Sequence, residues 1–240
     1  MDQDKPNLFA FATSELSQDT FLAWLLSWAD PKYAAFDPPV HQCAVRLVRF
    51  LLGVSDDDPI QSVVVGRQWE GIDVWAEVNE AYFILIEDKK GTRDHSNQLT
   101  RYLKIAQEYA REKGISVVPI YFKMEEQGIW SGIHDSGFRI LSRADMLHIL
   151  KDYADDRDST NGNQILLDYY AYLCDLDRQV NSYKTLPLDA WQWHGWQGFF
   201  SALRKEFDGE WDYVPNPSGG FLGFWWSWRE GHFQGSQFEF

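Results

Sequence analysis

Hydrophobic residues recur every three to four positions along several segments of the chain, which is the spacing of one face of an α-helix. The first such segment opens at Thr13-Ser14-Glu15 and closes at Asp30-Pro31, so the pattern predicts a helix over residues 16–28. The same period predicts further helices over residues 41–52, 96–113, 142–150, 164–183 and 191–207.

Runs of β-branched and aromatic residues predict strands between these helices. The predicted strands cover residues 62–65, 72–78, 81–87, 115–122 and 138–141. The run from Tyr82 to Ile86 is apolar without alternation, which is typical of a central strand covered on both faces. This order of helices and strands predicts an α/β fold with a mixed central sheet flanked by helices.

The character of the sequence changes after residues 155–163 (DDRDSTNGN), which form the most linker-like segment of the chain. Seven of the twelve tryptophans lie between Trp191 and Trp228. We therefore predict a core over residues 1–154, a linker over 155–163, and an aromatic-rich α+β extension packed on the core over 164–240. Such a density of aromatic side chains favours a hydrophobic core and a protein interface over stacking on bases.

Composition excludes several classes of protein. With 45% hydrophobic and 24% charged residues, the chain is neither a disordered tail, a collagen nor a long coiled coil. Cys43 and Cys174, the only cysteines, belong to no CxxC or CxxH pattern, so we expect no disulfide framework and a cytoplasmic location. We expect no signal peptide, because the N-terminal residues MDQDKPN lack a basic region followed by an apolar stretch. We expect no membrane partner, because the most apolar stretch, residues 21–29, is too short to span a bilayer.

The net charge of −14 disfavours binding to nucleic acid unless the charge is unevenly placed. Residues 89–104 contain five basic residues and one acidic residue, a net charge of +4, which leaves −18 for the rest of the chain. The basic residues are Lys89, Lys90, Arg93, Arg101 and Lys104. This local basic segment suits a polyanionic substrate.

Four consecutive charges follow the aliphatic run of the central strand, in residues 84–90 (ILIEDKK). Because side chains alternate along a strand, Glu87 and Lys89 share one face, and a neighbouring hairpin strand can bring Asp73 beside them. Two adjacent carboxylates repel each other unless a cation or a shared proton offsets their negative charge. A hard divalent cation is the natural ligand for such a pair. Together with a lysine, such a pair is the minimum set for metal-assisted hydrolysis of a phosphodiester.

The order and context of these motifs resemble the PD-(D/E)XK nuclease superfamily, and in particular its bacterial branch often named PD-(D/E)XK nuclease family 4. The similar stretches are FLAWLL, IDV, IEDK and DHSNQLTRY, within residues 8–125. The resemblance implies a restriction-endonuclease-like fold and a nuclease that depends on Mg²⁺ or Mn²⁺. It also favours DNA over RNA as the substrate and suggests a setting in bacterial or phage defence. The sequence departs from the literal motif in having Ile72, not proline, before the first aspartate.

The resemblance implies a role for each matching residue. Asp73 and Glu87 are the expected metal ligands, together with the backbone carbonyl of Asp88. Lys89 is the expected catalytic lysine. Glu15, in the first helix, is the expected accessory acid that ligates the metal through water.

Gln98 and Tyr102, one helical turn apart, are expected to position the site or the substrate strand. The side chains expected to contact the substrate are Lys90, Arg93, Arg101 and Tyr102. Asp88 and Lys90 offer the same motif one residue later, which would move the set to the other face of the strand. We prefer Glu87 and Lys89 because the resembling family places Glu-x-Lys directly after the aliphatic run.

Two interpretations without catalysis stay open. An acidic, aromatic-rich chain can mimic DNA and occupy a nucleic-acid-binding protein. Alternatively, the nuclease fold can serve as a binding scaffold in a larger complex. In either case, the C-terminal aromatic lobe is the expected surface for a protein partner or a second copy of the chain.

Overall fold

The computed structural model of the chain describes residues 6–12, 14–89, 98–156, 161–207, 209–226 and 236–239. Contacts divide the chain into two compact units. The first comprises residues 1–124 and 133–173, and the second comprises residues 125–132 and 174–240. The boundary between them falls within helix α7 (Gln164–Val180), later along the chain than the linker expected at 155–163.

The first unit contains a five-stranded mixed sheet whose strands follow their order in the sequence. The strands are β1 (Val63–Trp69), β2 (Ile72–Val78), β3 (Tyr82–Lys89), β4 (Ser116–Lys123) and β5 (Arg139–Ser142). The first three strands pair antiparallel, and β3, β4 and β5 pair parallel. Every residue of β3 after Tyr82 is buried, which confirms the prediction of a central strand.

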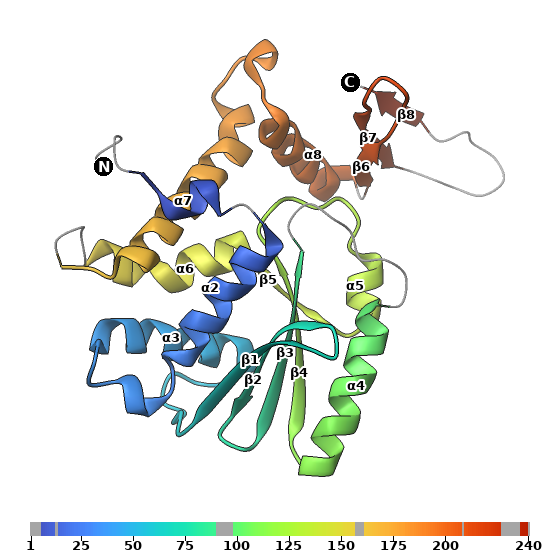
Figure 1. Cartoon of the computed structure of the whole chain (residues 1–240). Coiled ribbons are helices and arrows are strands. Elements are labelled where there is room, and N and C mark those ends of the chain that lie inside the picture. The colour runs from blue at the N-terminus through green and yellow to red at the C-terminus, as the bar shows by residue number, and fades with distance from the viewer. Residues whose placement is uncertain are drawn as a thin grey trace. The chain divides into compact units, whose positions relative to one another are not determined.

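Helices cover both faces of this sheet, which confirms the predicted α/β fold (Figure 1). Helix α4 (Gln98–Lys113) connects β3 to β4 and packs on one face. The other face is covered by α2 (Glu15–Ser27) and α3 (Pro38–Leu52), with α6 (Arg143–Asp155) against α3. Helix α3 begins three residues before its predicted start because Asp37 caps its first turn, where proline is tolerated. Two further helices are short, α1 (Leu8–Phe11) and α5 (Ser131–Asp135).

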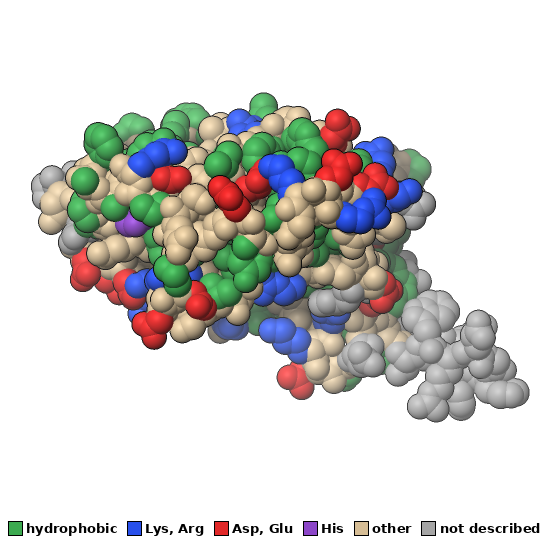
Figure 2. Space-filling view, turned by 90° about the horizontal axis from the view of Figure 1, so that it is seen from below, with side chains coloured by type: hydrophobic (Ala, Val, Ile, Leu, Met, Phe, Trp, Pro, Cys, Tyr) green, Lys and Arg blue, Asp and Glu red, His purple; other side chains and the backbone are tan. Residues whose placement is uncertain are grey.

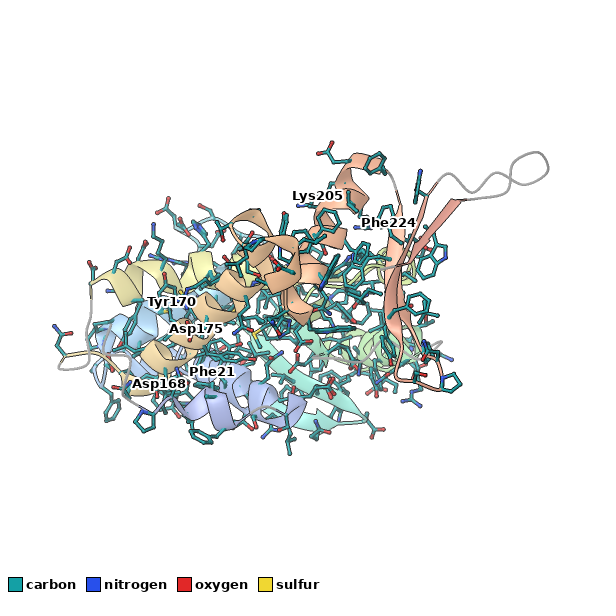
Figure 3. The ribbon with its side chains drawn as sticks, turned by 90° about the horizontal axis from the view of Figure 1, so that it is seen from above. Phe21, Asp168, Tyr170, Asp175, Lys205 and Phe224 are labelled. Carbon is teal, nitrogen blue, oxygen red and sulfur yellow. The ribbon has the colours of Figure 1, made fainter. Side chains whose placement is uncertain are left out.

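The first half of α7 belongs to the first unit because its aromatic side chains enter that core. Tyr169 is 1% exposed and stacks on Phe21 of α2, with ring centroids 3.6 Å apart. The backbone carbonyl of Asp168 accepts a hydrogen bond of 2.7 Å from the side chain of Asn7. Phe21 and Asp168 are labelled on these two helices in Figure 3. Because these aromatic side chains are buried in the first unit, the boundary between the two units lies after the polar segment at 155–163.

The second unit has an α+β core of its own. Helix α8 (Trp193–Phe207) precedes an antiparallel sheet of β6 (Glu210–Val214), β7 (Phe221–Trp226) and β8 (Ser236–Glu239). Phe200 of α8 stacks on Phe224 of β7 with ring centroids 6.0 Å apart, and Trp211 and Leu222 are buried beside them. The aromatic residues of the C-terminal segment thus form a hydrophobic core, as their density indicates.

Charged side chains of both signs are interspersed on the side of the molecule where α4 ends (Figure 2). The side chains drawn in colour there form no large patch of one sign. Among the helices of the described residues, none combines the length and the apolar character needed to cross a bilayer.

An ion pair on the α4 face makes stability depend on pH. Lys113 lies 2.8 Å from the carboxylate of Glu77, which also accepts a hydrogen bond from the hydroxyl of Tyr109. Burial alone would raise the pKa of Glu77, but these hydrogen bonds outweigh it and lower the pKa. A lowered pKa stabilises the folded chain above the ordinary pKa of glutamate, and this stabilisation is lost as the pH falls through the folded-state pKa.

We therefore expect Glu77→Gln to lower the melting temperature slightly at pH 7 and to lower it less at pH 3. Thermal denaturation followed by circular dichroism at both pH values measures the difference. An equal deficit at pH 7 and pH 3 would show that the ionised carboxylate contributes nothing.

Candidate active site

Five of the predicted site residues lie together near the end of β3. They are Asp73, Glu87, Lys89, Gln98 and Tyr102. Val74 pairs with Ile86 in the antiparallel register, so Asp73 lies across from Glu87 on the neighbouring strand. Gln98 begins α4 at the same end of the sheet at which β3 ends (Figure 1). The site is therefore assembled from two strands and the helix that covers them.

Glu87 is held by two donors at one of its oxygens. Lys89 Nζ lies 2.6 Å from Glu87 Oε1, and Gln98 Nε2 donates to the same oxygen at 2.9 Å. The second N–H of the Gln98 amide donates to the hydroxyl of Tyr102 at 3.0 Å. Glu87 is fully buried, and no donor of the described residues reaches its Oε2. One oxygen of this carboxylate is thus oriented and the other is available to a ligand.

The charges of the site depend on each other. Burial and the nearby carboxylate of Asp73 raise the pKa of Glu87 to about 8. Burial alone would lower the pKa of Lys89, but the ion pair with Glu87 outweighs it and raises the pKa, so Lys89 is an ammonium at neutral pH. The backbone N–H of Asp88 donates to Asp73 Oδ2 at 3.0 Å, which fixes the second carboxylate beside the first.

This donor set fits a hard divalent cation. Asp73 and Glu87 supply adjacent carboxylates, and the buried Glu87 Oε2 lacks a donor among the described residues. In the described part of the chain, no three or more His, Cys, Asp or Glu side chains gather so that they could hold a metal ion. A pair of carboxylates suits Mg²⁺, which usually binds one or two protein carboxylates and takes its other ligands from water and substrate phosphates.

Tyr102 is a buried side chain that holds Gln98 in place through its hydroxyl. It is 4% exposed, and its ring packs against Gly71 in the turn between β1 and β2. Gly71 has φ +88°, and a Cβ there would lie 2.9 Å from the hydroxyl of Tyr102. Arg101, predicted to contact the substrate, is exposed, and its guanidinium lies 4.9 Å from the centroid of the Tyr102 ring.

Substitution of Gly71 tests this support. We expect Gly71→Ala to cost about 1 kcal/mol of stability from the positive φ. We also expect it to slow any hydrolysis at the site by about tenfold, because it displaces Tyr102 and with it Gln98. Gly114→Ala is the matched control, since Gly114 has φ +71° and a Cβ added there would meet nothing within 4 Å. Thermal denaturation and cleavage assays measure both variants, and equal activity of the two would contradict the role of Tyr102.

The remaining predicted residues are less closely connected to this cluster. Glu15 begins α2, and its negative charge contributes to the raised pKa values of Lys89 and Asp19. Lys90 and Arg93 lie outside the described residues.

Sequence reasoning did not identify a second acidic pair on the opposite face of β3. The side chain of Asp88 points to the α2 side, where Gln18 Nε2 donates to its Oδ1 and the carboxylate of Asp19 lies beside it. Burial and the charge of Asp73 raise the pKa of Asp19 to about 6, and burial and Asp19 raise that of Asp88. The signal in the sequence is Asp19 itself, which lies four residues after Glu15 and therefore on the same side of the helix.

Comparison with known proteins places the chain in a family of nucleases. The family model described as the PD-(D/E)XK nuclease superfamily matches residues 6–171, which is more than half of the chain and includes both carboxylate pairs. The chain belongs to the PD-(D/E)XK nuclease superfamily, which confirms the resemblance seen in its sequence motifs. No curated protein and no solved structure matches it.

Proposed function

We propose that this protein is a nuclease that depends on Mg²⁺ or Mn²⁺ and hydrolyses phosphodiester bonds in DNA. The observation that carries the proposal is the arrangement of Asp73, Glu87 and Lys89 at the end of β3 in a chain of this superfamily. Buried carboxylates beside an ammonium are costly to maintain, and such clusters are concentrated at functional sites.

Each side chain of the site has a role that follows from its contacts. Asp73 and Glu87 would hold the divalent cation, together with the backbone carbonyl of Asp88. When bound, the cation neutralises charge on a phosphoryl oxygen and lowers the pKa of water. Lys89 would orient the attacking water and stabilise charge that develops on the phosphate.

Gln98 acts on the site through Glu87. Its amide donates to Glu87 Oε1 and to the hydroxyl of Tyr102, which fixes one rotamer of the carboxylate. The same oxygen accepts from Lys89, so Gln98 also supports the position of the ammonium. Gln98 is therefore a positioning residue in this proposal.

The distribution of charge supports a polyanionic substrate. Arg101 and Lys104 of α4 are exposed, and Lys90 and Arg93 precede them in the same basic segment. The acidic remainder of the chain limits nonspecific coating of nucleic acid, so contacts are expected to be concentrated near the site. DNA as the substrate, and a role in bacterial or phage defence, follow from the family resemblance.

The test is incubation of the purified protein with linear, circular and single-stranded DNA and with RNA. The reactions contain Mg²⁺ or Mn²⁺, with EDTA as the control. Cleavage of DNA that EDTA stops and that Asp73→Asn abolishes would support the proposal. Cleavage that survives Asp73→Asn unchanged would refute the assignment of the site. A chain that binds no divalent cation and cleaves nothing would favour the alternative, an acidic module that mimics DNA.

A further inference from the structure

Three buried oxygen atoms on the α2 side of β3 have no hydrogen-bond donor among the described residues. They are Gln18 Oε1, Asp19 Oδ1 and Asp88 Oδ2. Their residues are 4%, 2% and 1% exposed, so water in the bulk does not supply the missing donors. Buried acceptors and charges without partners cost free energy unless a proton or a cation lies among them.

Arg67 is the cationic side chain next to this group in the described part of the chain, and it does not neutralise the negative charge of the group. Arg67 Nη2 lies 3.9 Å from Asp19 Oδ2, and the same nitrogen donates to the backbone carbonyl of Leu16 at 3.1 Å. Lys89 is directed to the opposite face of β3, where it pairs with Glu87. The carboxylates of Asp19 and Asp88 therefore face each other with little positive charge between them.

We propose that Asp19, Asp88 and the amide oxygen of Gln18 bind a second divalent cation, on the face of β3 opposite to Glu87 and Lys89. The donors are all oxygens, which selects a hard cation such as Mg²⁺ or Mn²⁺ over one that prefers nitrogen or sulfur. The amide oxygen of Gln18 is the evidence that distinguishes this group from a simple cluster of acids. It is a neutral buried acceptor next to the pair, and no donor in the described part of the chain reaches it.

Asp73, an expected ligand of the first cation, also contacts residues next to the proposed second cation. Its Oδ2 accepts the backbone N–H of Asp88 at 3.0 Å. Its Oδ1 lies 3.5 Å from the amide nitrogen of Gln68, which is also 3.4 Å from Asp19 Oδ2. An ion that fixes Asp88 would therefore fix the backbone donor that orients Asp73. This positioning role rests on the proposed function, whereas the binding of the ion does not.

The experiment counts metal ions bound to the full-length chain. The metal-free protein is titrated with Mn²⁺, and bound ions are measured by calorimetry and by electron paramagnetic resonance. We expect two ions per wild-type chain and one in Asp19→Asn and in Asp88→Asn. Glu87→Gln should lose the other ion, so that Asp19→Asn combined with Glu87→Gln binds none. Glu77→Gln is the matched control and should keep two, because Glu77 is an ion-paired carboxylate away from both positions.

Counts that are the same in the wild type, Asp19→Asn and Asp88→Asn would overturn the proposal and indicate that the two aspartates share a proton. The two aspartates are substituted separately, so one variant that fails to fold leaves the other as the test. Two ions without cleavage of any nucleic acid would refute the proposed function and leave this inference standing. Cleavage of DNA, with an ion count that neither Asp19→Asn nor Asp88→Asn changes, would support the proposed function and refute this inference.

Discussion

Lys89→Met is expected to reduce the cleavage of DNA by about 10²- to 10³-fold while the chain remains folded. The ammonium of Lys89 lies 2.6 Å from Glu87 and has a raised pKa, so it carries its charge throughout the neutral range. Methionine keeps most of the volume of the side chain and removes the charge. The loss should appear in kcat, because charge on the phosphate develops in the transition state.

Lys113→Met is the matched control for this prediction. Lys113 forms an ion pair of similar length with Glu77, at 2.8 Å, on the same face of the sheet but in a more exposed position. Its removal should leave the rate of cleavage unchanged, because neither residue contacts the site. Measured kcat values for linear DNA in Mg²⁺ compare the two variants. Equal losses in both would indicate that the fold, and not Lys89, had been disturbed.

Asp88→Asn is expected to stabilise the metal-free chain by about 2 kcal/mol at pH 8. Asp88 is 1% exposed, and burial together with the charge of Asp19 raises its pKa. Asparagine keeps the oxygen that accepts from Gln18 and places N–H donors beside Asp19, so it removes a buried charge and supplies a missing hydrogen bond.

The sign of the pH dependence follows from the raised pKa values. A carboxyl group whose pKa is raised by folding favours the folded state fully below its ordinary pKa, and this contribution is lost as the pH rises. For Asp19, whose pKa moves from 3.8 to about 6, the loss falls between about pH 4 and pH 6. The pKa of Asp88 is raised as well, so the advantage of Asp88→Asn over the wild type should be small near the ordinary pKa of 3.8 and grow as the pH rises above it.

Unfolding by denaturant in EDTA measures the difference in the free energy of unfolding between Asp88→Asn and the wild type. Asp30→Asn is the control, because it removes a carboxylate whose pKa is lowered. Asp30 accepts hydrogen bonds from the backbone N–H groups of Lys32 and Val63, and these contacts outweigh burial and lower its pKa. Asp30→Asn should therefore be less stable than the wild type at pH 8. An Asp88→Asn chain that is no more stable than the wild type would show that the acidic pair is already balanced without metal.

Most of the sheet could be predicted from the sequence because its signals are local. The unbroken apolar run of β3 and the helical period of α4 each identify an element without reference to the rest of the chain. Strand β1 extends to Trp69, well beyond the predicted end at Val65, because Gly66, Arg67 and Trp69 pair with β2. Pairing with a neighbouring strand here overrides weak local propensity.

The predicted cluster around Glu87 follows from the same kind of local rule. Alternation along β3 places Glu87 and Lys89 on one face, and helical spacing places Gln98 next to Tyr102. The Asp19 and Asp88 pair does not follow from such a rule. It depends on how α2 lies against the far face of β3, and that placement is set by the packing of the whole core.

The most direct test of the central claim compares the wild type with Glu87→Gln in one measurement, the Mg²⁺-dependent cleavage of end-labelled linear DNA. We expect the wild type to cleave in Mg²⁺ and to stop when EDTA is added, and we expect Glu87→Gln to show no cleavage above background. A Glu87→Gln chain that cleaves as fast as the wild type would contradict the claim that this buried carboxylate is at the centre of the site.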